Sequence, residues 1–350
     1  MTFLRNTWYV AAWSREVISG TLLRRRLLGE QIVLFRDAQG AAKALLDRCP
    51  HRFAPLSLGR LCDGGDSVQC GYHGLRFDTD GQCVHNPHGD GRIPKAAVVR
   101  AYPVIERFSA IWIWMGEANK ADPALIPQFP FLVPEDNYVA CDKIEIDSHY
   151  ELESDNILDL SHIEFMHPLF SSDHVSQGRF ECIQDGDTIW SKRFIEDDTL
   201  PAFLHNAFGF APGQKADRWL DCRWDAPACM ALWTGAVTAG DVREKGQEVA
   251  GAHIFTPETE ARTHYFFAST FPRSMGPHAE QMAIESLAAA TGPKGVFTAE
   301  DKPMIEAQAE NMDGEDFWSL KPILLNIDAA AVRVRRLMAQ KIAAERSASV

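Results

Sequence analysis

The sequence from Cys49 to His73 reads Cys49-Pro-His51, then 18 residues, then Cys70-Gly-Tyr-His73. Cysteine and histidine in the order C-x-H…C-x-x-H can hold two irons, because thiolates bind one iron of a 2Fe-2S cluster and neutral imidazoles bind the other. Zinc competes, since two cysteines and two histidines also make a zinc site. However, in a zinc finger the cysteines pair with each other and so do the histidines. The order therefore favours a 2Fe-2S cluster held by all four residues.

The residues around these two loops predict a small antiparallel β domain. Pro50, Gly71 and Gly74 suit tight ligand loops on a β scaffold. His85 and His88 lie in a polar, glycine-rich segment and are interpreted as surface-loop residues. Short β-branched or aromatic runs recur with turn residues between them, at 8–13, 31–35, 44–46 and 110–114.

A second group of possible ligands runs from Asn156 to Pro168, in the order N-I-L-D-L-S-H-I-E-F-M-H-P. On a helix Asp159 and His162 would share a face, whereas His162 and His167 would point about 140° apart. Pro168 disfavours the helical conformation at His167, so the helix could end or distort there and return that ring to the site. Two imidazoles and one carboxylate form the facial triad of a non-haem Fe(II) centre. The alternative is a helix with two ordinary half-buried histidines.

Length, composition and charge limit the other possibilities. A chain of 350 residues exceeds a typical domain, and 46% hydrophobic with 24% charged residues is ordinary for a globular protein. The net charge of −13 argues against nucleic acid or an anionic membrane as a partner. No apolar run approaches the roughly 18 residues needed to span a bilayer, and the N-terminus does not resemble a signal peptide. We therefore expect a cytoplasmic protein whose eight cysteines form no disulfide framework.

Beyond the β domain the pattern changes twice. Four prolines between residues 119 and 134 indicate a linker, so we expect one domain at 1–118 and a second at 119–350. Strand-like segments then recur, at 138–146, 188–195, 229–237, 252–255 and 263–268. The last part turns helical, at 280–290, 299–312 and 328–346. This order of elements predicts an α+β chain.

Taken together, the motifs resemble the α subunits of Rieske non-haem iron aromatic ring-hydroxylating oxygenases over nearly the whole chain. The resemblance is closest to the short aromatic-acid members: dicamba O-demethylase, vanillate O-demethylase and toluenesulfonate methyl-monooxygenase. It implies an N-terminal Rieske antiparallel β domain and a C-terminal helix-grip (START-like) catalytic domain with a curved antiparallel sheet and helices. The matching strings begin at Asn6, Cys49, Tyr72, Ala110, Asp155, Ala216 and Thr256.

The resemblance also implies roles for acidic residues. Asp301, in Ala299-Glu-Asp301, matches the carboxylate of the iron triad, with Glu300 as the alternative. Without the resemblance, acids at a helix start would only favour the helix dipole. Asp159 matches the family's bridging acid, which would bond a ring nitrogen of His162 and a cluster ligand of a neighbouring subunit, His73. A simple surface acid is the alternative for Asp159.

Substrate residues are implied in the same way. Asn156 matches an asparagine near the iron, with a polar residue at a helix start as the alternative. His253 matches a histidine that binds a substrate carboxylate, although a histidine paired across a sheet fits as well. Leu232 stands where a relative has an asparagine, which indicates a more apolar pocket on that side. Trp233 and Phe255 would line this pocket or belong to the core.

The implied function is the terminal oxygenase of a monooxygenase that acts on a small substituted aromatic acid. The expected reaction is O-demethylation of a vanillate-like methoxybenzoate to a phenol and formaldehyde, using O2. Electrons would come from NAD(P)H through a separate reductase or ferredoxin, and the expected assembly is a head-to-tail homotrimer. Aryl-methyl hydroxylation and ring cis-dihydroxylation by the same iron are the alternatives. A plain Rieske electron carrier and a zinc-binding scaffold are the alternatives of another class.

Overall fold

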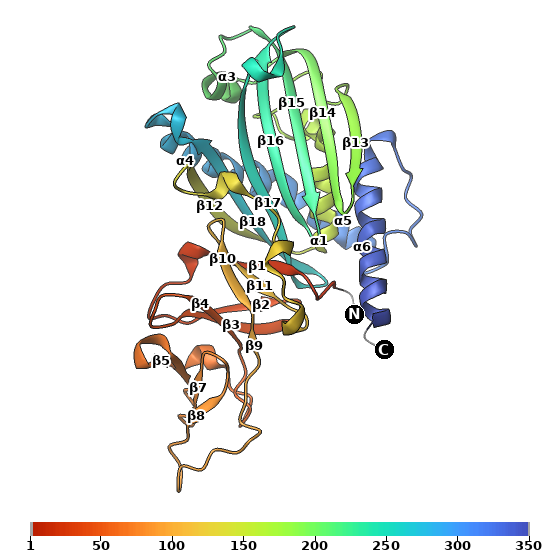
Figure 1. Ribbon diagram of the computed structural model, residues 1–350. Coiled ribbons are helices and arrows are strands. Elements are labelled where there is room, and N and C mark those ends of the chain that lie inside the picture. Colours follow the sequence, from red (N-terminus) through yellow and green to blue (C-terminus); the bar gives the residue numbers. More distant parts are fainter. Residues whose placement is uncertain (1–2, 349–350) are drawn as a thin grey trace. The chain divides into compact units, whose positions relative to one another are not determined.

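The computed structural model describes residues 3–348 and divides them into two compact units. The first comprises residues up to 126 together with 256–259, and the second comprises 127–255 and the residues from 260 onward. Figure 1 draws the first unit mainly in red to yellow and the second from yellow to blue. The predicted domain boundary, at 118/119, lies shortly before the first break between the units.

The first unit contains three small antiparallel sheets, as the short strand-like runs predict. Cys49 and Cys70 lie in its buried core beside apolar side chains such as Phe35 and Phe77. The sheets have the strand orders β1-β11-β10, β2-β3-β4-β9 and β5-β6-β7-β8. Their bounds are β1 Trp8–Trp13, β2 Leu23–Leu27, β3 Glu30–Arg36, β4 Ala42–Leu46, β5 Arg60–Cys62, β6 Ser67–Gln69, β7 Arg76–Asp78, β8 Cys83–His85, β9 Ala101–Tyr102, β10 Val104–Arg107 and β11 Ala110–Trp114.

The second unit is built on one seven-stranded sheet of order β12-β18-β17-β16-β15-β14-β13. Every register given for its neighbouring strands is antiparallel, and most of the pairs are long. Alternate residues of each strand therefore face the helices on one side of the sheet. The bounds are β12 Asn137–Ile146, β13 Arg179–Asp185, β14 Thr188–Thr199, β15 Lys215–Asp225, β16 Cys229–Thr238, β17 Gln247–Thr259 and β18 Arg262–Pro272.

Six helices accompany this sheet in the described chain, and Figure 1 shows α1 and α5 behind it, with α6 beside β13. Helix α4 packs on β12 and β18, whereas α6 packs on β13 and β14. The arrangement confirms the predicted α+β fold, with a β domain followed by a large antiparallel sheet and helices. The helices are α1 Tyr150–Leu158, α2 Ile163–Met166, α3 Ala202–Phe208, α4 His278–Thr291, α5 Lys302–Met312 and α6 Ala329–Ala348.

Two further observations concern the chain as a whole. All eight cysteines are free thiols, as expected for a chain without a disulfide framework. Within residues 3–348, no helix has both the length and the apolar character needed to cross a membrane.

Candidate metal centres and substrate cavity

The segment from α1 to α2 bends twice, and the bends bring two histidines together. Asp159 ends α1 with φ −119° and ψ 92°, and a short 3-10 turn then carries His162. Helix α2 ends at Met166, and His167, which precedes Pro168, leaves the helical region with φ −118° and ψ 78°. The two imidazole centroids are consequently 5.0 Å apart. The prediction that the helix ends or distorts near His167 is confirmed.

Asp301 completes this group from a distant part of the chain. It ends a five-residue π-helical turn, Phe297–Asp301, directly before α5. One carboxylate oxygen, Oδ2, lies 3.2 Å from Nε2 of His167, and the other, Oδ1, lies 3.6 Å from Nε2 of His162. Among the described residues, these three form the one group of His, Cys, Asp or Glu whose donor atoms all lie within 4.8 Å of one another. A π turn inside helical structure is often found at functional sites.

The outer nitrogen of each imidazole is occupied, which fixes the orientation of the ring. Nδ1 of His162 lies 2.6 Å from the backbone carbonyl oxygen of Asp159. Nδ1 of His167 lies 2.6 Å from Oε2 of Glu300. Such partners set the tautomer of a metal-binding histidine, because the Nδ1–H donates outward and Nε2 keeps its lone pair. Glu300, considered as an alternative ligand, thus orients His167 instead.

The donor set fits a divalent metal ion. Because both Nδ1–H groups donate outward, Nε2 of each ring carries a lone pair that faces the Asp301 carboxylate. Lone pairs and a carboxylate repel one another unless a proton or a cation lies between them. Asp301 is buried, and its Oδ2 has no hydrogen-bond partner despite the closeness of His167. Burial lowers the pKa of His162, whereas the carboxylates of Asp301 and Glu300 outweigh burial and raise the pKa of His167. Two imidazoles and one carboxylate suit Fe(II) with open coordination positions.

Asp159 lies at the rim of this centre. Its carboxylate accepts hydrogen bonds from the backbone N–H and the hydroxyl of Ser161, both at 3.0 Å. Nη2 of Arg193 lies 3.4 Å from the same carboxylate. The contact with His162 was expected from the side chain, but the Asp159 backbone carbonyl makes it. The difference arises because Asp159 leaves the helix, so its side chain turns to the start of the next turn.

The two predicted cluster loops have matching backbone geometry in the first unit. The N–H of Cys49 donates to the carbonyl of Ala54 at 2.9 Å, and that of Cys70 donates to the carbonyl of Leu75 at 2.8 Å. Gly74 has a positive φ of 76°, a conformation that suits glycine and closes the second loop tightly. Both loops are therefore closed by the same backbone bond, between the cysteine and the fifth residue after it.

The four side chains divide into a buried pair and an accessible pair. Cys49 and Cys70 are each 2% exposed, and burial together with the Cys70 thiol raises the pKa of Cys49 to about 11. The rings of His51 and His73 lie 4.6 Å apart at the edge of the loops. A single tetrahedral zinc would bring all four donor atoms within about 4 Å of one another. The described residues contain no such second group, so the arrangement fits two irons better than one zinc.

A largely apolar cavity of about 140 Å³ adjoins the triad in the second unit. An apolar cavity of about 150 Å³ in another protein accepts one benzene molecule, so this space has the size of a single aromatic ring. His162, His167 and Asp301 line one part of it. Other parts of its wall come from α1, α3, α4, the π turn and the strands β15 to β18.

His253 adds a polar group to this cavity. Burial lowers its pKa to about 3, so the ring is neutral at ordinary pH. Its Nδ1 lies 2.6 Å from the hydroxyl of Tyr265, and burial raises the pKa of Tyr265 well above its usual value. The phenol therefore keeps its proton and donates to Nδ1, which leaves Nε2–H of His253 as a donor beside Gly251 in the cavity wall. His253 is thus paired across the sheet, as the alternative interpretation expected, and its partner is Tyr265 on the neighbouring strand β18.

The two neighbouring strand residues considered for the pocket lie on opposite faces of β16. Leu232 lines the cavity. Trp233 instead stacks on Trp190 at a centroid distance of 5.6 Å and meets the edge of Phe131 at 5.8 Å. The prediction of Trp233 as a pocket residue is corrected, because successive side chains of a strand point to opposite faces. Phe255, with its ring 4.6 Å from that of Tyr265, is a buried core residue.

Two protein-family models match the chain. The Rieske [2Fe-2S] domain matches residues 7–103. The vanillate O-demethylase oxygenase C-terminal domain matches residues 146–344. Each match contains one of the two metal motifs.

Several characterised proteins are similar along nearly the whole chain. The oxygenase component of chloroacetanilide N-alkylformylase from Rhizorhabdus wittichii is 40% identical over 98% of this chain and 97% of its own. The oxygenase component of dicamba O-demethylase from Stenotrophomonas maltophilia is 39% identical over 96% of this chain and 97% of its own. A crystal structure of dicamba monooxygenase bound to dicamba superposes with a TM-score of 0.89 at 36% identity, covering 99% of this chain and 100% of that one.

Proposed function

This chain belongs to the Rieske non-haem iron oxygenases as an α subunit, and we propose that it O-demethylates a small methoxybenzoate. It is the terminal oxygenase component of a Rieske monooxygenase for aromatic substrates, with a 2Fe-2S cluster and a mononuclear iron at His162, His167 and Asp301. The proposed products are a phenol and formaldehyde. O2, two electrons and two protons balance the conversion, with one water as the further product.

The observation that carries the proposal is the ring-sized cavity beside the triad. Its volume of about 140 Å³ accommodates one aromatic ring, and Phe297 and Phe267 give it aromatic walls. Iron in a two-histidine, one-carboxylate site supplies O2 activation when bound. The chain would place a methoxy carbon near the triad by filling the remaining space with the ring.

The side chains around the cavity would have distinct tasks. His162, His167 and Asp301 would hold the metal, and Asn156 and Glu300 would keep two of these ligands oriented. Cys49, His51, Cys70 and His73 would hold the cluster. Nε2–H of His253 would donate a hydrogen bond to a substrate oxygen, because its Nδ1 already accepts from Tyr265.

Electron delivery would require a second copy of the chain. Exposed apolar side chains flank the cluster loops, namely Phe53, Leu58 and Tyr72, which are 70%, 75% and 66% exposed. Phe165 and Leu169, beside the iron ligands, are 76% and 43% exposed. Apolar surfaces of this kind favour a protein interface, and together they support the head-to-tail homotrimer. Asp159, at the rim of the iron site, would then bridge to His73 of the neighbouring copy, and a separate reductase would supply the electrons.

A second candidate is oxidation of a neutral N-alkylated or aryl-methyl substrate. Leu232 favours it, because this apolar side chain lines the cavity where a relative carries an asparagine. The chloroacetanilide N-alkylformylase relative favours it as well, since its name describes a neutral anilide substrate. Ring cis-dihydroxylation remains the other alternative reaction at the same centre.

The decisive experiment is turnover of defined probes by the iron-loaded protein with NADH and a reductase. Vanillate, 4-methoxybenzoate, 4-methylbenzoate and an N-alkyl anilide are supplied in parallel. The proposal expects formaldehyde and phenol in equal amounts from a methoxybenzoate. Benzylic alcohol from 4-methylbenzoate alone would assign methyl hydroxylation instead, and a dihydrodiol would assign dihydroxylation. Dealkylation of the anilide alone would replace the acid by a neutral substrate.

A further inference from the structure

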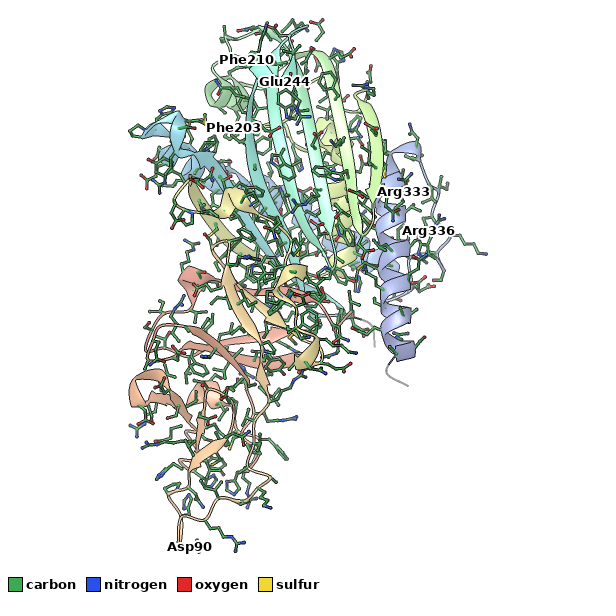
Figure 2. The ribbon with its side chains drawn as sticks, in the orientation of Figure 1. Asp90, Phe203, Phe210, Glu244, Arg333 and Arg336 are labelled. Atoms are coloured by element: carbon green, nitrogen blue, oxygen red, sulfur yellow. The ribbon has the colours of Figure 1, made fainter. Side chains whose placement is uncertain are left out.

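The cavity wall contains one residue whose charge the proposed mechanism does not use. Arg218 on β15 lines the cavity, and among the described residues that do so it is the only arginine or lysine. The side chain is 1% exposed. Its cross-strand neighbours, Ile195 on β14 and Ala236 on β16, are apolar, and so is Phe203 on α3, which also lines the cavity and is labelled in Figure 2. Burying a guanidinium costs folding free energy unless the charge is paired. The partners of Arg218 therefore decide whether this cost is compensated.

The partners of Arg218 use only part of its hydrogen-bonding capacity. Nη1 donates to the carbonyl of Phe170 at 3.1 Å. The nearest carboxylate oxygen, Oδ2 of Asp198, is 4.0 Å away and accepts a hydrogen bond from Ser172 instead. Nε of Arg218 and Oδ1 of Asp198 both lack a partner. The cation and the acid therefore lie side by side without forming a hydrogen-bonded pair.

Arg335, a second buried arginine of the same unit, donates hydrogen bonds from all three of its guanidinium nitrogens. Arg335 binds two carboxylates at once, with Nε and Nη2 at 2.9 and 2.6 Å from Asp155 and Nη1 at 2.7 Å from Glu151. Unlike Arg335, Arg218 forms no hydrogen bond to a carboxylate of the described chain, so its capacity to bind one is unused. Burial lowers the pKa of Arg218 to about 10, so the side chain stays charged at neutral pH.

His253, the histidine of the cavity wall outside the triad, is poorly suited to an anion. His253 is neutral, because burial lowers its pKa to about 3, and its ring lies 5.5 Å from Phe297 in the turn that ends at Asp301. A neutral N–H near the metal ligands suits an ether or hydroxyl oxygen of the group that is oxidised. Charge-assisted hydrogen bonds to a carboxylate are roughly twice as strong as neutral ones, which favours the arginine.

We propose that Arg218 is the substrate-binding residue that recognises the carboxylate of the aromatic acid through the part of its side chain that lines the cavity. This inference rests on the proposed function and deepens it. The acid group would bind at Arg218 on β15, and the other end of the ring would face His253 and the triad. The cavity would then bind acids in preference to neutral analogues. The position of Arg218 would determine which end of the ring faces the triad.

The test compares the binding of two probes of nearly identical shape, 4-methoxybenzoate and neutral 4-methoxybenzamide. Dissociation constants are measured by calorimetry on iron-loaded wild type, Arg218→Met, Arg218→Gln, Arg218→Lys and Arg223→Met. Arg223 is a matched control, because it lies on the same strand but bonds Asp225 and the Gln128 carbonyl outside the cavity. Thermal unfolding of each variant verifies that it is folded.

Wild type should bind the acid about tenfold or more tightly than the amide, since hydrogen bonds to charged groups contribute this much. Arg218→Met should remove that preference and leave amide binding within about threefold. Arg218→Lys should keep part of the preference for the acid, and Arg223→Met should keep all of it. If folded Arg218→Met or Arg218→Gln retains the wild-type preference, the assignment of Arg218 is wrong while the aromatic-acid function stands. If wild type binds the amide more tightly than the acid, both the proposed aromatic-acid substrate and the proposed role of Arg218 are wrong.

Discussion

Nδ2 of Asn156 donates a hydrogen bond to Oδ1 of Asp301 at 3.0 Å, across 145 positions of the chain. Asn156 lies in the last turn of α1, and Asp301 ends the π turn before α5. The bond occupies Oδ1, the oxygen nearer His162, and leaves Oδ2, which has no hydrogen-bond partner, 3.2 Å from Nε2 of His167. We therefore propose that Asn156 holds the orientation of the acidic ligand.

The first prediction follows from this bond. Asn156→Leu keeps the approximate side-chain volume but removes the donor, so Asp301 should rotate more freely and the iron affinity should fall about ten- to a hundredfold. Competition with an Fe(II) chelator measures the loss. The visible absorption of the cluster should not change. Ser154→Ala on the same helix, which removes only a bond to the Tyr150 carbonyl, serves as the control. An unchanged competition curve for Asn156→Leu would assign the asparagine to helix structure alone.

The second prediction separates the two metal centres. His51→Ala should abolish the visible absorption of the cluster, because the imidazole ligand of one iron is lost. His162→Ala should keep that absorption and two acid-labile sulfides per chain, but it should lose the mononuclear iron. Iron and sulfide analysis of anaerobically purified protein distinguishes these outcomes. The opposite pattern would show that the two sets of ligands have been exchanged.

The ligand types could be predicted from the sequence, because the metal-binding residues lie in short motifs with characteristic spacings. C-x-H and C-x-x-H place donors on loops irrespective of the tertiary fold, and Pro168 indicates where the helix must end before His167. The choice between Glu300 and Asp301 could not be made from spacing alone. On a regular helix they diverge by about 100°, and the π turn that directs both toward His167 is not indicated by the local sequence.

Some side-chain contacts could be predicted only in kind. A pairing of His253 across the sheet was considered, but its partner Tyr265 on the neighbouring strand depends on the register of β17 and β18. The approach of Arg193 to Asp159 depends on the bend after α1. The alternation along β16, which directs Leu232 into the cavity and its neighbour away from it, requires the register of the whole sheet. Sequence patterns therefore predict which residue types form the site, whereas the tertiary structure determines which side chains contact one another.

The third prediction concerns Asp159. Asp159→Asn keeps the shape of the side chain but removes its charge, so both metals should stay bound while turnover falls about a hundredfold. The expected cause is loss of coupling between the centres of neighbouring copies. Stopped-flow reoxidation of the reduced cluster should slow to the same extent, which a merely structural role would not produce. Asp185→Asn, at an exposed strand end, should behave as wild type. Reoxidation at the wild-type rate would exclude Asp159 from the electron path.

Glu153 on α1 provides the fourth prediction, which concerns stability. Burial raises its pKa from 4.5 to about 8, so the folded protein keeps this carboxyl protonated at neutral pH. The Ser148 hydroxyl donates to Oε1 at 2.5 Å, and Oε2 has no partner. An unfolded chain ionises the same group near pH 4.5. Between these two values the folded state binds the extra proton, so stability should decrease as the pH rises through this window.

Glu153→Gln should remove this part of the pH dependence, because glutamine is neutral in both states. The variant should gain stability relative to wild type as the pH rises from about 5 to 8, by an amount on the order of a few kcal/mol at most. Urea unfolding of both proteins at three pH values across the window measures the difference. Glu310→Gln, an exposed change on α5, controls for the loss of one charge. Parallel pH profiles for wild type and Glu153→Gln would mean that Glu153 is ionised in the folded protein despite its burial.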